Sequence, residues 1–254
     1  MGRDHASPRF HVPPPAPPAA WVRGTELALP PGEAHHAAHV LRLAPGSVVT
    51  VFDGRGGAAE ARISRAARGE VSAVVEAVHP PAARPRPMVR LAFAIPKGRR
   101  LDWLLEKATE LGAARLAPVR FARSVAGGAA LSASARARLE ARCIAAAKQA
   151  GADWLPEIEP LRPLPDALPA GEPALFGDTS ADAQPVAEAL AAVEDLDETA
   201  HLHLYVGPEG GLTDDERRLL RSAGAAGVRL VRTVLRIETA AVALLAATKA
   251  ILGP

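Results

Sequence analysis

The sequence predicts an α/β protein in which a small β-rich part precedes a larger part where strands alternate with helices. Three observations carry this prediction. Residues 21–80 contain several short apolar runs separated by turns. Prolines then interrupt the pattern and mark a linker, at Pro80, Pro81, Pro85 and Pro87. Residues 88–254 alternate short apolar runs with stretches of helical spacing, which is typical of a mainly parallel sheet.

The composition agrees with a folded protein. Of the 254 residues, 48% are hydrophobic but only 4% are aromatic, so the core has to be built from Ala, Leu and Val. The net charge of +2 is too small to indicate a nucleic-acid partner, and any basic surface must be local. Arginine far outnumbers lysine, which suits bidentate phosphate contacts, although the base composition of a genome explains it equally well.

Cysteine and histidine usage bears on metals and on compartment. The single cysteine, Cys143, excludes an internal disulfide framework and a cysteine-based zinc site. His35, His36 and His39 have the spacing of one helix face, but no third ligand is apparent, so we expect no metal. Neither a signal peptide nor a run of transmembrane length is visible, and we therefore expect a cytoplasmic protein.

The first part begins with a proline-rich stretch at residues 1–20, which we expect to be an extended or disordered arm because its prolines exclude helix and central strand. Residues 9–12 within it are a candidate edge strand. Strands are expected at residues 24–29, 47–52, 58–63 and 70–78, with one short helix at residues 34–43. Several short strands joined by turns predict a small barrel.

The second part contains longer elements. Strands are expected at residues 89–95, 174–176 and 201–206, and helices at residues 99–111 and 134–150. In the first of these helices the apolar residues recur at helical spacing, and Gly112 is placed to end it.

The stretch Gly207-Pro-Glu-Gly-Gly211 is the most informative chemical feature. It follows an apolar strand and precedes a helix that Thr213 and Glu216 begin as a capping box. Glycines let the backbone turn sharply and approach a ligand, and ligands of open α/β sheets lie at the carboxyl ends of strands. Glu209 would then lie beside a ligand. The alternative is a tight turn with no ligand.

A second stretch, residues 228–253, begins like a strand and breaks near Thr233. Glu238 or Thr239 is then expected to cap a long helix that ends at Gly253. Arg236 and Glu238 would lie at the helix N-terminus, where unpaired N–H groups attract anions and acceptors. An Arg–Glu pair that only braces the loop is the alternative.

A third stretch places Lys97, Arg99 and Arg100 at the start of a helix, where basic groups oppose the helix dipole. A nearby phosphate or carboxylate would relieve that clash. Along the same helix a like-charged stripe of Asp102, Glu106 and Glu110 requires solvent or basic partners. We expect those partners to be Arg115, Arg120 or Arg123.

Taken together, these stretches resemble the RsmE family, the 16S rRNA (uracil-N3)-methyltransferases of the SPOUT superfamily. The resemblance covers nearly the whole chain. It is carried by His36-Ala-Ala-His-Val-Leu-Arg-Leu-Ala-Pro-Gly46, Val51-Phe-Asp-Gly54, residues 97–112, Pro118 with Arg123-Ser124, Val206-Gly-Pro-Glu-Gly-Gly211 and Leu235-Arg-Ile-Glu-Thr-Ala240.

The resemblance implies a fold and an assembly. Residues 21–84 would form a PUA-like RNA-binding barrel, and residues 85–254 a SPOUT methyltransferase domain with a parallel sheet and a C-terminal trefoil knot. The protein would be a homodimer that binds S-adenosyl-L-methionine in the knot, without metal or membrane, and acts on 16S rRNA of the small ribosomal subunit.

The resemblance also implies site residues. The cofactor would meet two loops and a third backbone wall, at Phe176, Val206, Gly207, Pro208, Glu209, Gly210, Gly211, Leu230, Thr233, Val234, Leu235 and Arg236. RNA would contact Arg42, Lys97, Arg99, Arg100 and Lys107. For the chemistry, Arg236 and Arg123 are candidates for stabilising the ring or binding phosphate, because arginine keeps its proton. Glu209 and Glu238 are candidate bases, or they orient the arginines.

The chain departs from the family pattern in two places. Members usually read Leu-Gly-Pro-Arg where this chain has Leu230-Val-Arg-Thr233, so that loop lacks its glycine. Members also usually carry Glu-Gln-x-x-Arg where this chain has Lys148-Gln-Ala-Gly-Ala152, so an arginine is missing. These departures motivate an alternative function, that of a non-catalytic or differently targeted SPOUT RNA-binding protein.

Overall fold

The computed structural model describes residues 7–13, 21–67, 69–125, 132–193 and 201–253. The chain forms two compact units: Met1–Arg84 with Ala147–Leu155, and Pro85–Ala146 with Pro156–Pro254. The sequence did not indicate that residues 147–155 belong to the first unit. Most of the expected N-terminal arm, residues 1–6 and 14–20, lies outside the described residues.

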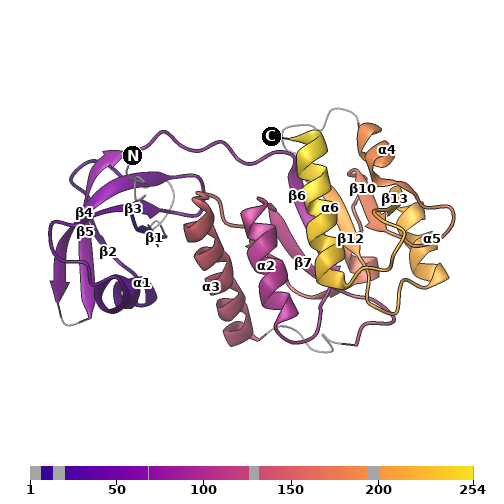
Figure 1. Ribbon diagram of the computed structural model, residues 1–254, viewed down its shortest axis with the longest axis horizontal. Helices are drawn as coiled ribbons and strands as arrows, with labels where there is room; N and C mark the ends of the chain where they lie inside the picture. The colour runs from indigo at the N-terminus through magenta and orange to yellow at the C-terminus, as the bar shows by residue number, and fades with distance from the viewer. Residues whose placement is uncertain (1–6, 14–20, 68, 126–131, 194–200, 254) are drawn as a thin grey trace. The chain divides into compact units, whose positions relative to one another are not determined.

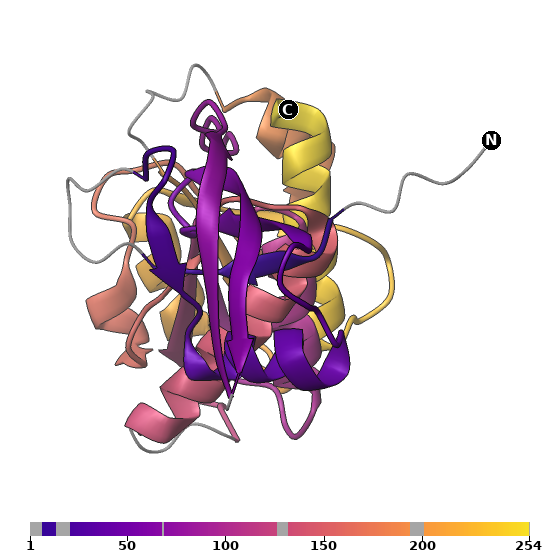
Figure 2. The ribbon, with the colours of Figure 1, turned by 90° about the vertical axis from the view of Figure 1, so that its left-hand side faces the viewer.

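The first unit is built on a five-stranded sheet. Its strands are β1 (Arg9–His11), β2 (Glu26–Ala28), β3 (Val48–Phe52), β4 (Ala58–Ala67) and β5 (Glu70–Val78), in the order β1-β3-β4-β5-β2. β1 runs parallel to β3 at one edge, and the other pairs are antiparallel. Figure 2 shows the long β4–β5 pair. The short helix α1 (Pro31–His35) begins earlier than expected and continues as a π-helical turn, His36–Val40.

One face of this sheet forms the first core. Alternate residues of β4 and β5 point inward, because side chains of a strand alternate between its two faces. They pack with Phe10 of β1, which is fully buried. The inward residues are Ala59, Ala61, Ile63, Val71, Ala73 and Val75.

The segment 147–155 completes the first unit. Arg9 donates to the carbonyl oxygen of Ala152 at 3.2 Å and forms an ion pair with Asp153. Trp154 Nε1 donates to Ala82 O at 2.9 Å. Ala152, the position where the family arginine is missing, packs against a small cluster that includes the buried ring of Phe52. The departure at Ala152 therefore belongs to the packing of the first unit.

The second unit contains an eight-stranded sheet, and all its pairings among the described residues are parallel. The order is β11-β13-β10-β12-β6-β7-β8, with β9 also paired to β7. The strands are β6 (Met88–Ala94), β7 (Arg115–Arg120), β8 (Glu157–Ile158), β9 (Arg162–Pro163), β10 (Ala174–Gly177), β11 (Gln184–Pro185), β12 (His201–Val206) and β13 (Ala225–Arg229). The expected α/β class is confirmed; the trefoil knot stays a prediction.

Helices cover both faces of this sheet. They are α2 (Arg100–Glu110), α3 (Ala133–Ala150), α4 (Val186–Ala191), α5 (Asp214–Ser222) and α6 (Ile237–Leu252), with a 3₁₀ turn at Leu164–Ala167. α2 and α6 lie side by side, and α6 also packs against β6 and β12, whereas α5 packs against β13 (Figure 1). No helix in the described ranges combines the length and the apolar character that a membrane crossing needs.

The start of α6 differs from the expectation. The N-cap is Arg236, in extended conformation and without a side-chain capping bond, and not Glu238 or Thr239. The helix begins earlier because Ile237, Ala241, Leu244 and Leu245 form one continuous buried face. Glu238 consequently lies in the first turn, where a carboxylate interacts favourably with the helix dipole.

Candidate active site

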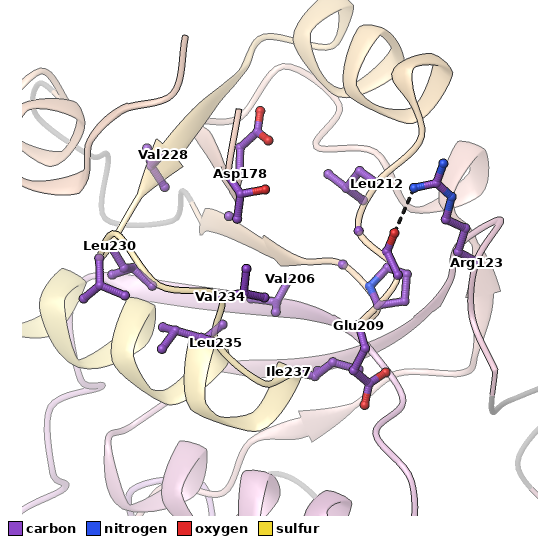
Figure 3. A pocket seen from close by; sticks show the side chains of 18 of the residues that line it. Arg123, Asp178, Val206, Glu209, Leu212, Val228, Leu230, Val234, Leu235 and Ile237 are labelled. Carbon is purple, nitrogen blue, oxygen red and sulfur yellow. Dashed lines mark hydrogen bonds between the residues drawn. The ribbon is translucent and has the colours of Figure 1, made fainter. Parts of the chain in front are cut away.

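A pocket of about 310 Å³ opens at the carboxyl ends of β10, β12 and β13 (Figure 3). This volume is at the lower end of the range for small-molecule sites. Three segments supply its walls, namely residues 206–212, 177–179 and 228–240. Its polar lining comes from Arg123, Asp178, Thr179, Glu209, Arg217 and Thr233, and its apolar lining includes Val206, Leu212, Val228, Leu230, Val234, Leu235 and Ile237.

The glycine loop forms the first wall and requires its glycines. A Cβ at Gly207 would lie 2.7 Å from Leu212 Cδ2, so a side chain there displaces Leu212 from the pocket. Gly211 has a φ of +70°, a left-handed conformation that L side chains rarely adopt, and its N–H donates to Pro208 O at 2.8 Å. The loop is thus a tight turn whose backbone faces the pocket.

Glu216 fixes the end of this loop. The expected capping box is confirmed: Thr213 accepts from Glu216 N, and Glu216 accepts from Thr213 N at 2.8 Å. The second carboxylate oxygen of Glu216 accepts from Ala122 N at 2.7 Å. The buried Glu216 side chain therefore joins the start of α5 to the segment that follows β7.

Arg123 lies next to Ala122 and reaches the same loop. Its Nη1 donates to the carbonyl oxygen of Gly210 at 2.8 Å (Figure 3). Its aliphatic stem packs on Gly210, where a Cβ would lie 3.3 Å from Arg123 Cβ. Arg123 lines the pocket, and its hydrogen bond is to the glycine loop.

The third wall is the backbone after β10, which the sequence placed near Phe176-Gly177. Phe176 is fully buried and does not line the pocket; Gly177, Asp178 and Thr179 do. Asp178 N donates to Val228 O at 2.8 Å, which ties this wall to β13. The sequence does carry a signal for this wall, because the polar residues Asp178-Thr-Ser180 directly follow an apolar strand. Ligands of open α/β sheets bind at this edge of the sheet.

The carboxylate of Asp178 is buried and holds this wall in place. It accepts from Ser180 Oγ at 2.6 Å and from Arg217 Nε at 3.2 Å. Burial alone would raise the pKa of this carboxyl, but the hydrogen bonds from Ser180 and Arg217 lower it below its ordinary value. Asp178 is therefore a charged group that fastens the wall to α5.

The loop before α6 supplies the remaining wall through Leu230, Thr233, Val234 and Leu235. Val231, at the missing glycine, also lines the pocket, and 48% of its surface is exposed. Arg236 is not among the lining residues, because it is the exposed residue immediately before α6.

The two candidate bases lie near one arginine. Arg100 Nη1 is 3.4 Å from Glu209 Oε1 and 3.9 Å from Glu238 Oε1. Glu209 reaches away from the centre of the pocket in Figure 3. Glu238 is 7% exposed, and its Oε2 is buried without a hydrogen-bond partner among the described residues.

The residues expected to contact RNA have different surroundings. Lys97 and Arg99 are exposed, whereas Lys107 is bound by Glu106 and Glu110 of its own helix, and those hydrogen bonds raise its pKa. Arg42 is exposed in the first unit, with a φ of +53°.

The partners expected for the acidic stripe of α2 were wrong for Asp102, which pairs with Arg138 and Arg142 of α3 at 2.7 and 3.5 Å.

In the first unit the rings of His35 and His39 lie 4.7 Å apart. Within the described ranges, no group of three or more His, Cys, Asp or Glu side chains is arranged to hold a metal.

Comparison with known protein families shows which class of protein this chain belongs to. Residues 84–249 match the RNA methyltransferase domain, and residues 29–76 match the RNA methyltransferase PUA domain. These two matches assign a methyltransferase domain to most of the second unit and a PUA domain to the sheet of the first.

Relatives narrow the class. The chain is 35% identical over 226 residues to ribosomal RNA small subunit methyltransferase E of Mycobacterium bovis, covering 85% of this chain and 82% of the relative. It is 30% identical over 239 residues to the Synechocystis protein of the same name, covering 89% and 73%. The chain belongs to the ribosomal RNA small subunit methyltransferase E family.

A solved relative carries the cofactor. The Neisseria gonorrhoeae ribosomal RNA small subunit methyltransferase E, bound to S-adenosyl methionine, superposes with a TM-score of 0.81 at 26% identity, covering 97% of this chain and 98% of that one. The likeness extends over both units of the chain.

Proposed function

We propose that this protein is an S-adenosyl-L-methionine-dependent methyltransferase that methylates N3 of a specific uridine in 16S ribosomal RNA. The observation that carries the proposal is the pocket at the carboxyl ends of β10, β12 and β13, closed by the glycine loop. Family membership supports the same reaction class. Residues 21–84 would act as the PUA-like RNA-binding part and residues 85–254 as the SPOUT domain, in a cytoplasmic enzyme.

The pocket fits the cofactor. Its lining is apolar at Val206, Leu230 and Leu235, which suits an adenine ring, and the backbone of the glycine loop can approach polar atoms closely. Of the residues we assign to the cofactor, Val206, Gly207, Pro208, Glu209, Gly210, Gly211, Leu230, Thr233, Val234 and Leu235 line the pocket. The other two residues assigned to the cofactor, Phe176 and Arg236, do not line the pocket. We propose that the buried Phe176 supports its wall from behind and that Arg236 lies beside it at the start of α6. The bound cofactor supplies an electrophilic methyl group.

The remaining chemistry falls to the protein. The uracil imide has to be held in line and lose its N3 proton, and the negative charge of the ring has to be stabilised. We propose that Glu209, which lines the pocket, or Glu238, in the first turn of α6, accepts this proton or orients an arginine. Arg236 is exposed at the start of α6, where it can meet an incoming base or phosphate, and Arg123 lines the pocket.

We propose that RNA binds through exposed basic residues, namely Arg42, Lys97 and Arg99, with smaller contributions from Arg100 and Lys107 of α2. Each phosphate contact releases counterions, so binding should weaken steeply with salt. The target base would be reached in a single-stranded or unstacked region.

We further propose a homodimer. Val231 and Val234 support it, because both line the pocket yet expose 48% and 78% of their surface. Exposed apolar side chains beside a ligand site are typical of a surface that another chain covers. Light scattering on the purified protein tests the assembly.

The decisive experiment is transfer of a labelled methyl group from S-adenosylmethionine to small ribosomal subunits that lack the modification, followed by mapping of the modified nucleotide. The proposal expects one modified uridine, alkylated at N3. Calorimetry with S-adenosylmethionine distinguishes the enzyme from the alternative function, that of a non-catalytic RNA-binding protein. A protein that only binds RNA would take up no cofactor. Modification of another RNA would retain the enzyme and change its substrate.

A further inference from the structure

Arg100 connects three segments that are distant in the sequence. It is the first residue of α2, Glu209 lies in the glycine loop, and Glu238 lies in the first turn of α6. A single guanidinium nitrogen, Nη1, is 3.4 Å from Glu209 Oε1, where it donates a hydrogen bond, and 3.9 Å from Glu238 Oε1. The arginine thus contacts both carboxylates that we consider for the chemistry.

Glu238 makes this arrangement chemically significant. Its side chain is 9% exposed, and its Oε2 has no hydrogen-bond partner among the described residues. A buried carboxylate without a compensating partner is costly. The ion pair with Arg100 is the cation contact recorded for it in the described part of the chain. An unpartnered, buried oxygen at the edge of a ligand pocket indicates a group whose position matters for function.

The neighbouring basic residues behave differently. Lys97 and Arg99 precede α2 and are exposed, and neither forms an ion pair among the described residues. They are available to phosphate, whereas Arg100 is engaged by carboxylates. The cluster at the start of α2 therefore divides into two exposed cations and one that faces inward to the site.

We propose that Arg100 is a positioning residue for methyl transfer and not primarily an RNA contact. It holds the carboxylates of Glu209, in the glycine loop, and Glu238, in α6, in fixed positions relative to each other. This inference rests on the proposed function. A charged hydrogen bond to Glu209 limits the movement of the loop, and the same guanidinium orients the buried Glu238. Arg100 and Glu209 are partly exposed, so their pair adds little to stability, whereas the contact with the buried Glu238 adds more; the free energy of unfolding of each variant is therefore measured beside its kcat.

The test compares Arg100→Ala with Arg99→Ala, which removes the same charge one residue away. We measure kcat, the KM for RNA and the affinity for S-adenosylhomocysteine by calorimetry. Arg100→Ala is expected to lower kcat about tenfold or more, while its KM for RNA rises no more than that of Arg99→Ala. Arg100→Lys should recover part of kcat, because it keeps the charge but not the planar guanidinium.

A double variant shows whether Arg100 acts through Glu238. The effects of Arg100→Ala and Glu238→Gln on kcat should be less than additive when combined, because both remove the same arrangement. Equal increases of the RNA KM in Arg100→Ala and Arg99→Ala, with kcat unchanged, would overturn the inference and leave the proposed function intact. Absence of methyl transfer by the wild-type protein, with or without cofactor binding, would overturn both.

Discussion

The guanidinium of Arg123 donates a hydrogen bond to the carbonyl oxygen of Gly210 at 2.8 Å, which joins the segment after β7 to the glycine loop after β12. The adjacent N–H of Ala122 donates to Glu216, at the start of the helix that follows the same loop. Two contacts from one short segment therefore hold the C-terminal part of the loop and the start of the helix that follows it. The strand β7 matters for the pocket although it contributes little of its lining.

Replacing Arg123 should weaken cofactor binding. Arg123→Ala removes the hydrogen bond and the stem that packs on Gly210, so the Kd for S-adenosylhomocysteine is expected to rise about tenfold, which corresponds to about 1.4 kcal/mol. Arg123→Lys keeps most of the stem and should lose less. Calorimetry measures both, and an unchanged Kd for the alanine variant would show that the contact is incidental.

Adding a branched side chain at Gly210 should close the loop to the cofactor. A Cβ there already lies 3.3 Å from Arg123 Cβ, and the two methyl groups of Gly210→Val extend further into the same space. The variant is expected to lose measurable cofactor binding while it still folds. Gly32→Ala, whose Cβ meets nothing within 4 Å, is the control. Retained affinity in Gly210→Val would mean that the loop is only a turn.

Arg236 should matter for transfer and little for folding. Its side chain is exposed and makes no capping bond, so Arg236→Ala is expected to change the free energy of unfolding by less than about 0.5 kcal/mol. Methyl transfer should fall by about 10²-fold or more if the guanidinium stabilises developing charge. Arg232→Ala, in the same loop but outside the lining, is the matched control. A fully active Arg236→Ala protein would contradict the role.

The Asp178 carboxylate should make stability depend on pH. Its pKa lies below the ordinary value of 3.8, so its charged form stabilises the folded state above that pH, and the contribution is lost as pH falls through the folded-state pKa. Asp178→Asn should cost about 1–3 kcal/mol near neutral pH, and the difference from wild type should shrink below about pH 4. Denaturant unfolding at several pH values measures this. Asp182→Asn, at a carboxylate that is 63% exposed, should show a much smaller effect.

A buried ion pair at the opposite end of the sheet should affect stability alone. Arg90 and Glu159 form a bidentate pair, with distances of 2.8 and 2.7 Å, and only 8% and 14% of their side chains are exposed. Glu159→Ala leaves the buried Arg90 without its counter-charge and should cost about 3–5 kcal/mol. Glu157→Ala, whose side chain is 60% exposed, should cost less than about 1 kcal/mol. The affinity for S-adenosylhomocysteine should stay unchanged in both folded variants.

Local patterns in the sequence predicted the parts of the site that local chemistry determines. The glycine loop and the capping box of Thr213 and Glu216 are read directly from adjacent residues, and the structure contains both. The helix from Arg100 follows from its apolar spacing. These features need no knowledge of which strands are neighbours.

Other parts depend on neighbours that are distant in the sequence. Asp178 was missed because its partner Arg217 lies on α5 and its backbone partner on β13. β7 was missed, and β13 was expected only as a strand-like start at residue 228, because Pro118 and Gly227 weaken their strand patterns; pairing to both sides overrides that weakness. Likewise, nothing adjacent to Arg100 indicates that its partners are Glu209 and Glu238.

The inclusion of residues 147–155 in the first unit has a consequence for biosynthesis and for fragment design. The N-terminal sheet is made first on the ribosome, but its Arg9, Gly54 and Gly56 remain without Asp153, Leu155 and Trp154 until the intervening residues 85–146 have been translated. A fragment that stops at residue 84 would lack this closing piece. Expression of the PUA part alone would therefore need the 147–155 peptide supplied in trans or grafted back by a linker.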